Sequence, residues 1–176
     1  MTIIPPQSMA LSHARMAAAA VMLWLAAAYA PACAAPKIGK AAPALIVAQL
    51  DGKTFDLAKL RGKVVLVNYW ATWCAPCRKD IPKLDAFYRH YHAKGLDMIG
   101  ISVDDPHDLA KVRKVMASLA YPVAMLKGVT VDGFGPPDGV PITWIVDVNG
   151  TIRDHMIDVR DELLDGLVVP LLPHRD

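Results

Sequence analysis

Two cysteines three residues apart, Cys74 and Cys77, are the residues whose type and spacing best fit a chemical role in this chain. They follow the apolar, β-branched run KVVLVNYWA (63–71), which predicts a buried strand. Residues 75–94 predict a helix that ends before a glycine. Cys74 is therefore expected at the N-terminus of a helix. Free backbone N–H groups and the helix dipole favour a thiolate at such a position.

The spacing of the two cysteines distinguishes a redox pair from a metal ligand set or a structural disulfide. A Cys2His2 zinc site needs a second ligand pair at matching spacing, and the six histidines are scattered, so no metal site is expected. A disulfide that closes so short a loop adds little stability, because the entropic gain grows with loop length. Pro76, between the cysteines, has the fixed φ that suits a helix start. The pattern predicts a reversible redox pair that needs no cofactor.

Residues 1–34 have the pattern of an export signal. Residues 1–15 contain no acid, residues 16–30 (MAAAAVMLWLAAAYA) are uncharged, and Ala-x-Ala sites follow. Pro31 interrupts the apolar run before the roughly 20 residues that a membrane span needs, which favours a cleaved signal over a retained anchor. We expect an exported, periplasmic protein. It would be attached to the membrane only if the N-terminus is retained, as an anchored protein facing the periplasm, or if Cys33 carries a lipid.

The length and charge of the chain limit its domains and partners. The 176 residues leave room for one domain, expected over residues 35–176. The net charge is +2, and it falls to about +1 without residues 1–34 because Arg15 is lost. This balance provides neither a basic stripe for nucleic acid nor a polybasic membrane patch, so neither partner is expected.

The order of predicted elements is hairpin, strand, helix, strand, helix, strand, hairpin and helix. Asp51-Gly52 predicts a type I′ turn in the first hairpin, and Asn149-Gly150 marks the second. PVAML (122–126) predicts a short strand, and the Gly- and Pro-rich residues 127–139 predict a loop with at most a turn of helix. This order predicts an α/β fold with three layers, α/β/α, a mixed central sheet and an N-terminal β-hairpin.

Two longer stretches, GKVVLVNYWATWCAPCRKDIP (62–82) and GVPITWIVDVNGTI (139–152), resemble the thioredoxin superfamily. They are most similar to its exported TlpA/ResA-like thiol–disulfide oxidoreductases, which have an AhpC/TSA-redoxin-like domain. The resemblance covers roughly residues 40–170 and implies a thioredoxin-like fold. It implies that Cys74 attacks protein disulfides and that Cys77 resolves the mixed disulfide. It also implies a reductase, for example in cytochrome c biogenesis, that a membrane electron donor recharges.

The resemblance assigns roles to three residues that would face a substrate. Pro141 aligns with a cis-proline beside the cysteine pair, which makes Val140 a substrate-contacting residue through its main chain. Trp73 would cover the surface around the pair, and a half-buried packing aromatic is a compatible alternative for it. Pro76, between the cysteines, is a fourth candidate for substrate binding.

A carboxyl group near the pair is a candidate proton carrier. Asp80 stands where this branch has an acid three residues after the second cysteine, one helical turn beyond Cys77. It would relay the proton of Cys77 through a water molecule. The alternative is an exposed acid that is favourable to the helix dipole. Asn68 stands where cytosolic thioredoxins have a buried Asp, and an amide cannot take up a proton.

Two other functions remain open on the sequence. Peroxiredoxins share this fold, but their reactive cysteine follows a threonine by three positions, and Ala71 occupies that place here. A Cu(I) chaperone could use the two thiolates as soft ligands, although such relatives have a longer Cys spacing and a distal His. The loop predicted over residues 127–139 replaces a short helix that precedes the cis-proline in the family. It is a candidate for shaping partner choice, and the alternative is a surface loop without such a role.

Overall fold

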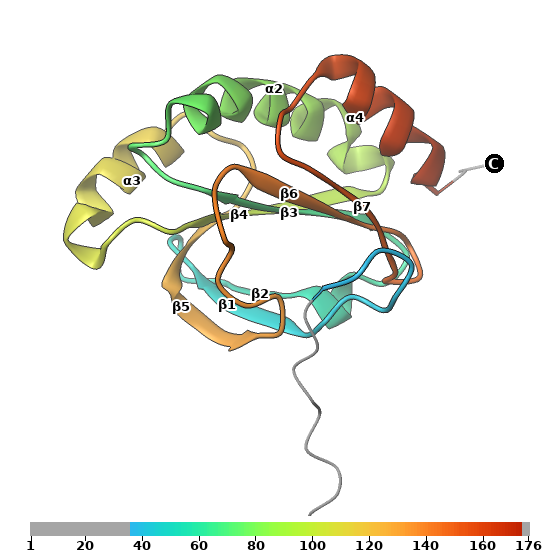
Figure 1. Ribbon diagram of the computed structural model, residues 1–176, viewed down its shortest axis with the longest axis horizontal. Coiled ribbons are helices and arrows are strands. Elements are labelled where there is room, and N and C mark those ends of the chain that lie inside the picture. The colour runs from blue at the N-terminus through green and yellow to red at the C-terminus, as the bar shows by residue number, and fades with distance from the viewer. Residues whose placement is uncertain (1–35, 174–176) are drawn as a thin grey trace, which may run out of the picture. The chain divides into compact units, whose positions relative to one another are not determined.

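A computed structural model describes residues 36–173 of the chain; the predicted export signal, Cys33 included, lies outside this range. Seven strands form one mixed sheet in the order β2-β1-β5-β4-β3-β6-β7 (Figure 1). The strands are β1 (Leu45–Gln49), β2 (Thr54–Asp56), β3 (Val64–Trp70), β4 (Leu96–Ser102), β5 (Val123–Asp132), β6 (Ile142–Val146) and β7 (Ile152–Met156). The α-helices are α2 (Ala75–Tyr91), α3 (Leu109–Met116) and α4 (Asp161–Leu167). Four short 3-10 turns are η1 (Leu57–Leu60), η2 (His92–Lys94), η3 (Pro106–Asp108) and η4 (Val169–Leu171).

The centre of the sheet is parallel and its flanks are antiparallel. Strands β3 and β4 pair in parallel along their full lengths, and every residue of both is buried. Strand β5 continues the parallel part, while β6 and β1 pair antiparallel with β3 and β5. This arrangement confirms the predicted element order and the mixed sheet. It places the ends of β3 and β4 at the same edge of the sheet, where α2 begins.

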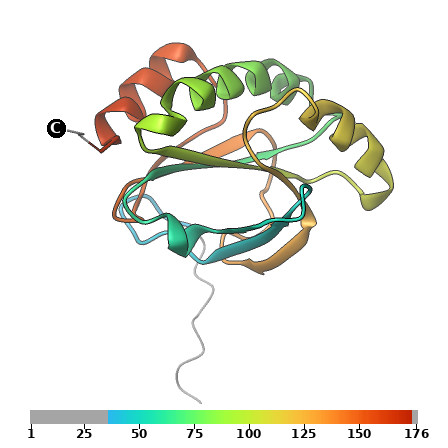
Figure 2. The ribbon, with the colours of Figure 1, turned by 180° about the vertical axis from the view of Figure 1, so that it is seen from behind.

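The two faces of the sheet are covered by different kinds of structure. Helices α2, α3 and α4 lie on one side of the sheet in both views (Figures 1 and 2). On the other side, the sheet curls so that β1, β2, η1 and the end of β5 enclose a second apolar core. The thioredoxin-like α/β class is therefore confirmed. Within residues 36–173, the second outer layer contains the 3-10 turn η1 in place of a long helix.

The first hairpin has a different turn from the one predicted. The backbone N–H of Gln49 donates to the carbonyl of Lys53 at 2.8 Å, which leaves a three-residue loop over residues 50–52. Gly52 has a φ of +89°, while no described non-glycine residue has a positive φ. A type I′ turn needs positive φ at two successive residues, so that prediction is wrong. One left-handed glycine after an ordinary turn closes the hairpin instead.

Strand β5 is longer than its sequence indicated. Residues 127–132, predicted as a loop, continue the strand to Asp132 because the edge of β1 supplies pairing partners, such as Val47 for Val129. Its first residues pair with β4 and its last with β1, so the strand crosses from the parallel centre to the curled edge. Only residues 133–139 of the predicted loop lack helix and strand.

Candidate active site

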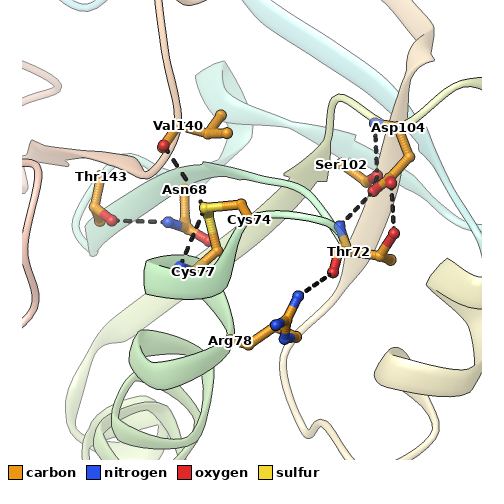
Figure 3. The surroundings of a disulfide bond; sticks show 9 residues. All are labelled: Asn68, Thr72, Cys74, Cys77, Arg78, Ser102, Asp104, Val140 and Thr143. Carbon is orange, nitrogen blue, oxygen red and sulfur yellow. Dashed lines mark hydrogen bonds between the residues drawn. A yellow bond between two sulfur atoms is a disulfide. The ribbon is translucent and has the colours of Figure 1, made fainter.

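The two cysteines lie at the start of α2, directly beyond the carboxyl end of β3. Cys74 is the N-cap residue, and its sulfur accepts a hydrogen bond from the backbone N–H of Cys77 at 3.2 Å. Their sulfur atoms form a disulfide, with the Cα atoms 5.3 Å apart (Figure 3). Pro76 occupies the first turn, where its missing N–H costs no hydrogen bond. On reduction, the backbone N–H of Cys77 and the helix dipole stabilise a thiolate at Cys74.

A cis peptide bond lies beside the disulfide. The Val140–Pro141 bond is cis, as the resemblance implied, and the Val140 carbonyl oxygen lies 3.6 Å from the sulfur of Cys74 (Figure 3). The antiparallel pairing of β6 with β3 brings the two together, because Thr143 pairs with Asn68 near the end of β3. The backbone of residue 140 therefore lies next to the sulfur expected to react first.

A buried carboxyl group that sequence reasoning missed holds the segment before the cysteines. Asp104 follows β4, and its oxygens accept hydrogen bonds from the Thr72 backbone N–H at 2.9 Å and the Thr72 hydroxyl at 2.6 Å. The Ser102 hydroxyl donates to it as well, at 2.7 Å (Figure 3). A sequence signal existed, since polar residues that directly follow two neighbouring parallel strands meet at one edge of the sheet.

Thr72 is also held from the helix. The guanidinium of Arg78 donates to the Thr72 carbonyl at 2.8 Å, across the first turn of α2 (Figure 3). Thr72 thus bonds through its N–H, hydroxyl and carbonyl to Asp104 and Arg78. The turn that carries Trp73 and Cys74 is fixed from both sides. Trp73 itself is 65% exposed and stands out from this turn.

Asn68 lies beneath the disulfide in the buried end of β3. Its side-chain amide donates to the Thr143 hydroxyl at 2.9 Å (Figure 3). Its amide oxygen is buried and has no hydrogen-bond partner among the described residues. Asn68, at the position where cytosolic thioredoxins have a buried Asp, is therefore a neutral amide that a hydrogen bond to strand β6 holds in place.

Asp80 is buried, with 4% of its surface exposed. The alternative of an exposed acid in the first helical turns is therefore wrong. Burial is the main cause that raises the pKa of Asp80 above its ordinary 3.8, and the nearby Asp158 carboxylate adds to it. A hydrogen bond from the Val159 backbone N–H and the charge of the Lys83 ammonium group lower the pKa of Asp80. One oxygen of the Asp80 carboxyl has no hydrogen-bond partner within residues 36–173.

The described residues provide neither a metal site nor a membrane-spanning helix. In the described part of the chain, no group of three or more His, Cys, Asp or Glu side chains is arranged to hold a metal ion. None of the helices among these residues is both long and apolar enough to cross a lipid bilayer.

The family model described as "AhpC/TSA family" matches residues 38–155, which include both cysteines and the cis-proline. The chain belongs to the AhpC/TSA family. The chain is similar to "Thiol-disulfide oxidoreductase ResA" of a Bacillus cereus strain. The two are 33% identical over 138 residues, which cover 78% of this chain and 80% of the relative. The protein of the same name from Geobacillus thermodenitrificans is 28% identical over 119 residues, covering 66% of this chain and 67% of the relative.

Solved structures support the same assignment within the AhpC/TSA family. A thiol:disulfide interchange protein of Chlorobium tepidum TLS has a TM-score of 0.63 at 28% identity, over 79% of this chain and 100% of the other. The thioredoxin domain of a thiol-disulfide oxidoreductase from Bacteroides vulgatus has a TM-score of 0.63 at 27% identity, over 77% and 98%. This AhpC/TSA protein is a thiol–disulfide oxidoreductase of the ResA type with a Cys74–Cys77 pair.

Proposed function

We propose that this protein reduces disulfides in other exported proteins, with Cys74 as the attacking residue. The observation that carries the assignment of Cys74 as the attacking residue is the hydrogen bond from the Cys77 N–H to its sulfur at the start of α2. A thiolate at Cys74 attacks one substrate sulfur and forms a mixed disulfide, and the other substrate sulfur leaves and takes up a proton. Cys77 then attacks the Cys74 sulfur, which releases the second substrate thiol and restores the protein disulfide. Two electrons pass from protein to substrate.

The surface around the pair supports contact with a polypeptide. Trp73 is exposed beside Cys74, and Pro76 opens the helix between the cysteines. Val140 presents its main chain next to the Cys74 sulfur, with the cis bond to Pro141 setting its direction. We infer that these four residues bind the substrate segment that carries the target disulfide.

Asp80 is proposed to accept the proton of Cys77 through a water molecule. Its burial and raised pKa support this role, because a carboxyl with a pKa closer to neutrality accepts and returns protons more readily. In Asp80→Asn, the reactivity of Cys77 should lose its dependence on pH in the range where this carboxyl titrates. An unchanged profile would exclude the relay.

The biological setting follows from the sequence pattern. Residues 1–34 resemble an export signal, which would place the domain in the periplasm, free or held by a retained or lipidated N-terminus. Reductases are recharged by a donor, and across a membrane that donor is a membrane protein whose dithiol reduces the Cys74–Cys77 disulfide. Substrates in cytochrome c biogenesis fit this setting, because their cysteines must be reduced before they are used.

The reduction potential of the pair tests the proposed direction. Equilibration with glutathione buffers, followed by quantification of the Cys74 and Cys77 thiols by mass spectrometry, gives its value. A reductase should have a potential near that of thioredoxin, about −270 mV. A potential near about −120 mV, as in strong periplasmic oxidants, would make the protein an oxidase and overturn the proposal.

A further inference from the structure

A hollow of about 840 Å³ lies beside the cis peptide bond, under the loop of residues 133–139. We call it the proline-loop groove; its lining includes Tyr69, Phe134, Pro136, Asp138, Val140 and Trp144. The groove occupies the place where the family was expected to have a short helix. It exists here because β5 ends at Asp132 and the chain then runs to the cis-proline without helix or strand.

The loop that forms the groove is held in place by Asp132. One carboxyl oxygen of Asp132 accepts hydrogen bonds from the backbone N–H groups of Phe134 and Gly135, both at 3.1 Å. The Tyr69 hydroxyl donates to the same oxygen at 3.4 Å and joins the loop to β3. These hydrogen bonds within the chain preorganise the groove, which lowers the entropic cost of filling it.

The groove is continuous with the site of disulfide exchange. Val140 lines the groove, and its carbonyl oxygen lies 3.6 Å from the Cys74 sulfur. A polypeptide whose cysteine is bonded to Cys74 must pass Val140. Extended chain advances about 3.3 Å per residue, so side chains within about three residues of that cysteine can reach the groove.

The lining of the groove defines the chemistry of its occupant. Tyr69, Phe134 and Trp144 contribute aromatic rings, and prolines and aliphatic side chains contribute most of the rest. Ile157 also lines the groove, and this large apolar side chain is 69% exposed. Among the described lining residues, the exposed Asp138 is the one that carries a charge. The surface therefore fits a bulky apolar side chain accompanied by a cation.

We propose that the proline-loop groove selects substrates by binding an extended segment with a bulky apolar residue and a Lys or Arg within about three residues of the target cysteine. The apolar side chain lies against Ile157 and the aromatic rings, and the cation lies near Asp138. This inference rests on the proposed disulfide reductase function and adds a substrate class to it.

Disulfide-closed peptides test the proposal with the full-length reduced protein. All share one Cys-Ala-Ala-Cys ring, and the flanking residues are Leu-Lys, Ser-Lys or Leu-Glu. In each turnover the Cys74–Cys77 dithiol becomes a disulfide and the peptide disulfide becomes two thiols, which acid quenching and chromatography count. The Leu-Lys peptide should react about fivefold faster than either of the others, the effect of burying one apolar side chain or pairing one exposed charge.

Paired variants place any preference in the groove. Ile157→Ser should remove most of the preference for Leu over Ser, while Ile38→Ser, an exposed isoleucine outside the lining, should keep it. Asp138→Lys should reverse the preference for Lys over Glu, while Asp165→Lys, which has the same charge change on α4, should not.

The outcomes of these experiments separate the groove proposal from the reductase function. Equal rates for the three peptides, or preferences that survive both groove variants, overturn the groove proposal and leave the reductase function intact. Failure to reduce any peptide overturns the reductase function itself. A dimer of the wild-type chain that Ile157→Ser dissociates would assign the groove to a second copy of the chain and also overturn the proposal.

Discussion

Asp104 accepts hydrogen bonds from both the backbone N–H and the hydroxyl of Thr72, at 2.9 and 2.6 Å. The two residues lie 32 positions apart, just beyond the ends of β4 and β3. The position of the turn that carries Cys74 thus depends on a side chain from the neighbouring strand.

Replacing Asp104 should destabilise this turn. In Asp104→Ala, the partly buried donors of Thr72 and the buried hydroxyl of Ser102 lose their acceptor, which should lower the free energy of unfolding by about 1–3 kcal/mol. Urea unfolding of the oxidised protein measures the change. Asp165→Ala, an exposed acid on α4, should change the same quantity by less than about 0.5 kcal/mol. Equal stabilities of the two variants would show that Asp104 does not hold the turn.

Asp80 should make stability fall with rising pH. Its pKa is raised in the folded protein, chiefly by burial, whereas the unfolded chain titrates near 3.8. Between these two pKa values the folded state binds more protons than the unfolded state, so the free energy of unfolding decreases as pH increases. The contribution is fully present below the unfolded pKa and is lost as pH rises through the folded pKa.

The difference between wild type and Asp80→Asn isolates this carboxyl. Denaturant unfolding at several pH values should show the wild type losing stability relative to the variant from about pH 4 upward, until the folded carboxyl is ionised. A difference that stays constant with pH, or one that changes in the opposite direction, would contradict a raised pKa.

Hydrogen peroxide should oxidise the reduced protein slowly. Ala71, which is fully buried, stands where peroxiredoxins have the threonine three positions before the reactive cysteine, and alanine has no hydroxyl to orient a peroxide. Stopped-flow fluorescence with excess peroxide, beside a peptide disulfide as the alternative substrate, measures both reactions. Faster oxidation by peroxide than by the disulfide would favour the thiol peroxidase alternative.

The central part of the fold was predictable because it depends on local patterns. The buried run of β3, the cysteine spacing and the Asn149-Gly150 turn each occupy a few successive residues, and together they indicated the element order, the mixed sheet and the place of the pair. The cis bond before Pro141 was predicted from the resemblance, since a proline before a strand is usually trans.

Features that depend on distant residues were missed. Residues 127–132 form a strand because β1 pairs with them, although their own composition indicates a loop. The burial of Asp80 arises from the loop before α4, which brings Val159 and Asp158 next to the carboxyl group. The bonds between Thr72 and Asp104 also join residues beyond two separate strands, so predicting them requires the strand order of the sheet as well as the local sequence.

The acidity of Cys74 is the quantity on which the proposed chemistry depends. The rate of iodoacetamide alkylation of the reduced full-length protein, followed at Cys74 by mass spectrometry across a series of pH values, gives the pKa of this thiol. A sulfur that accepts the Cys77 N–H at a helix N-terminus should titrate well below the value of free cysteine, about 8.5. A midpoint at or above about 8.5 would contradict the assignment of Cys74 as the attacking thiolate.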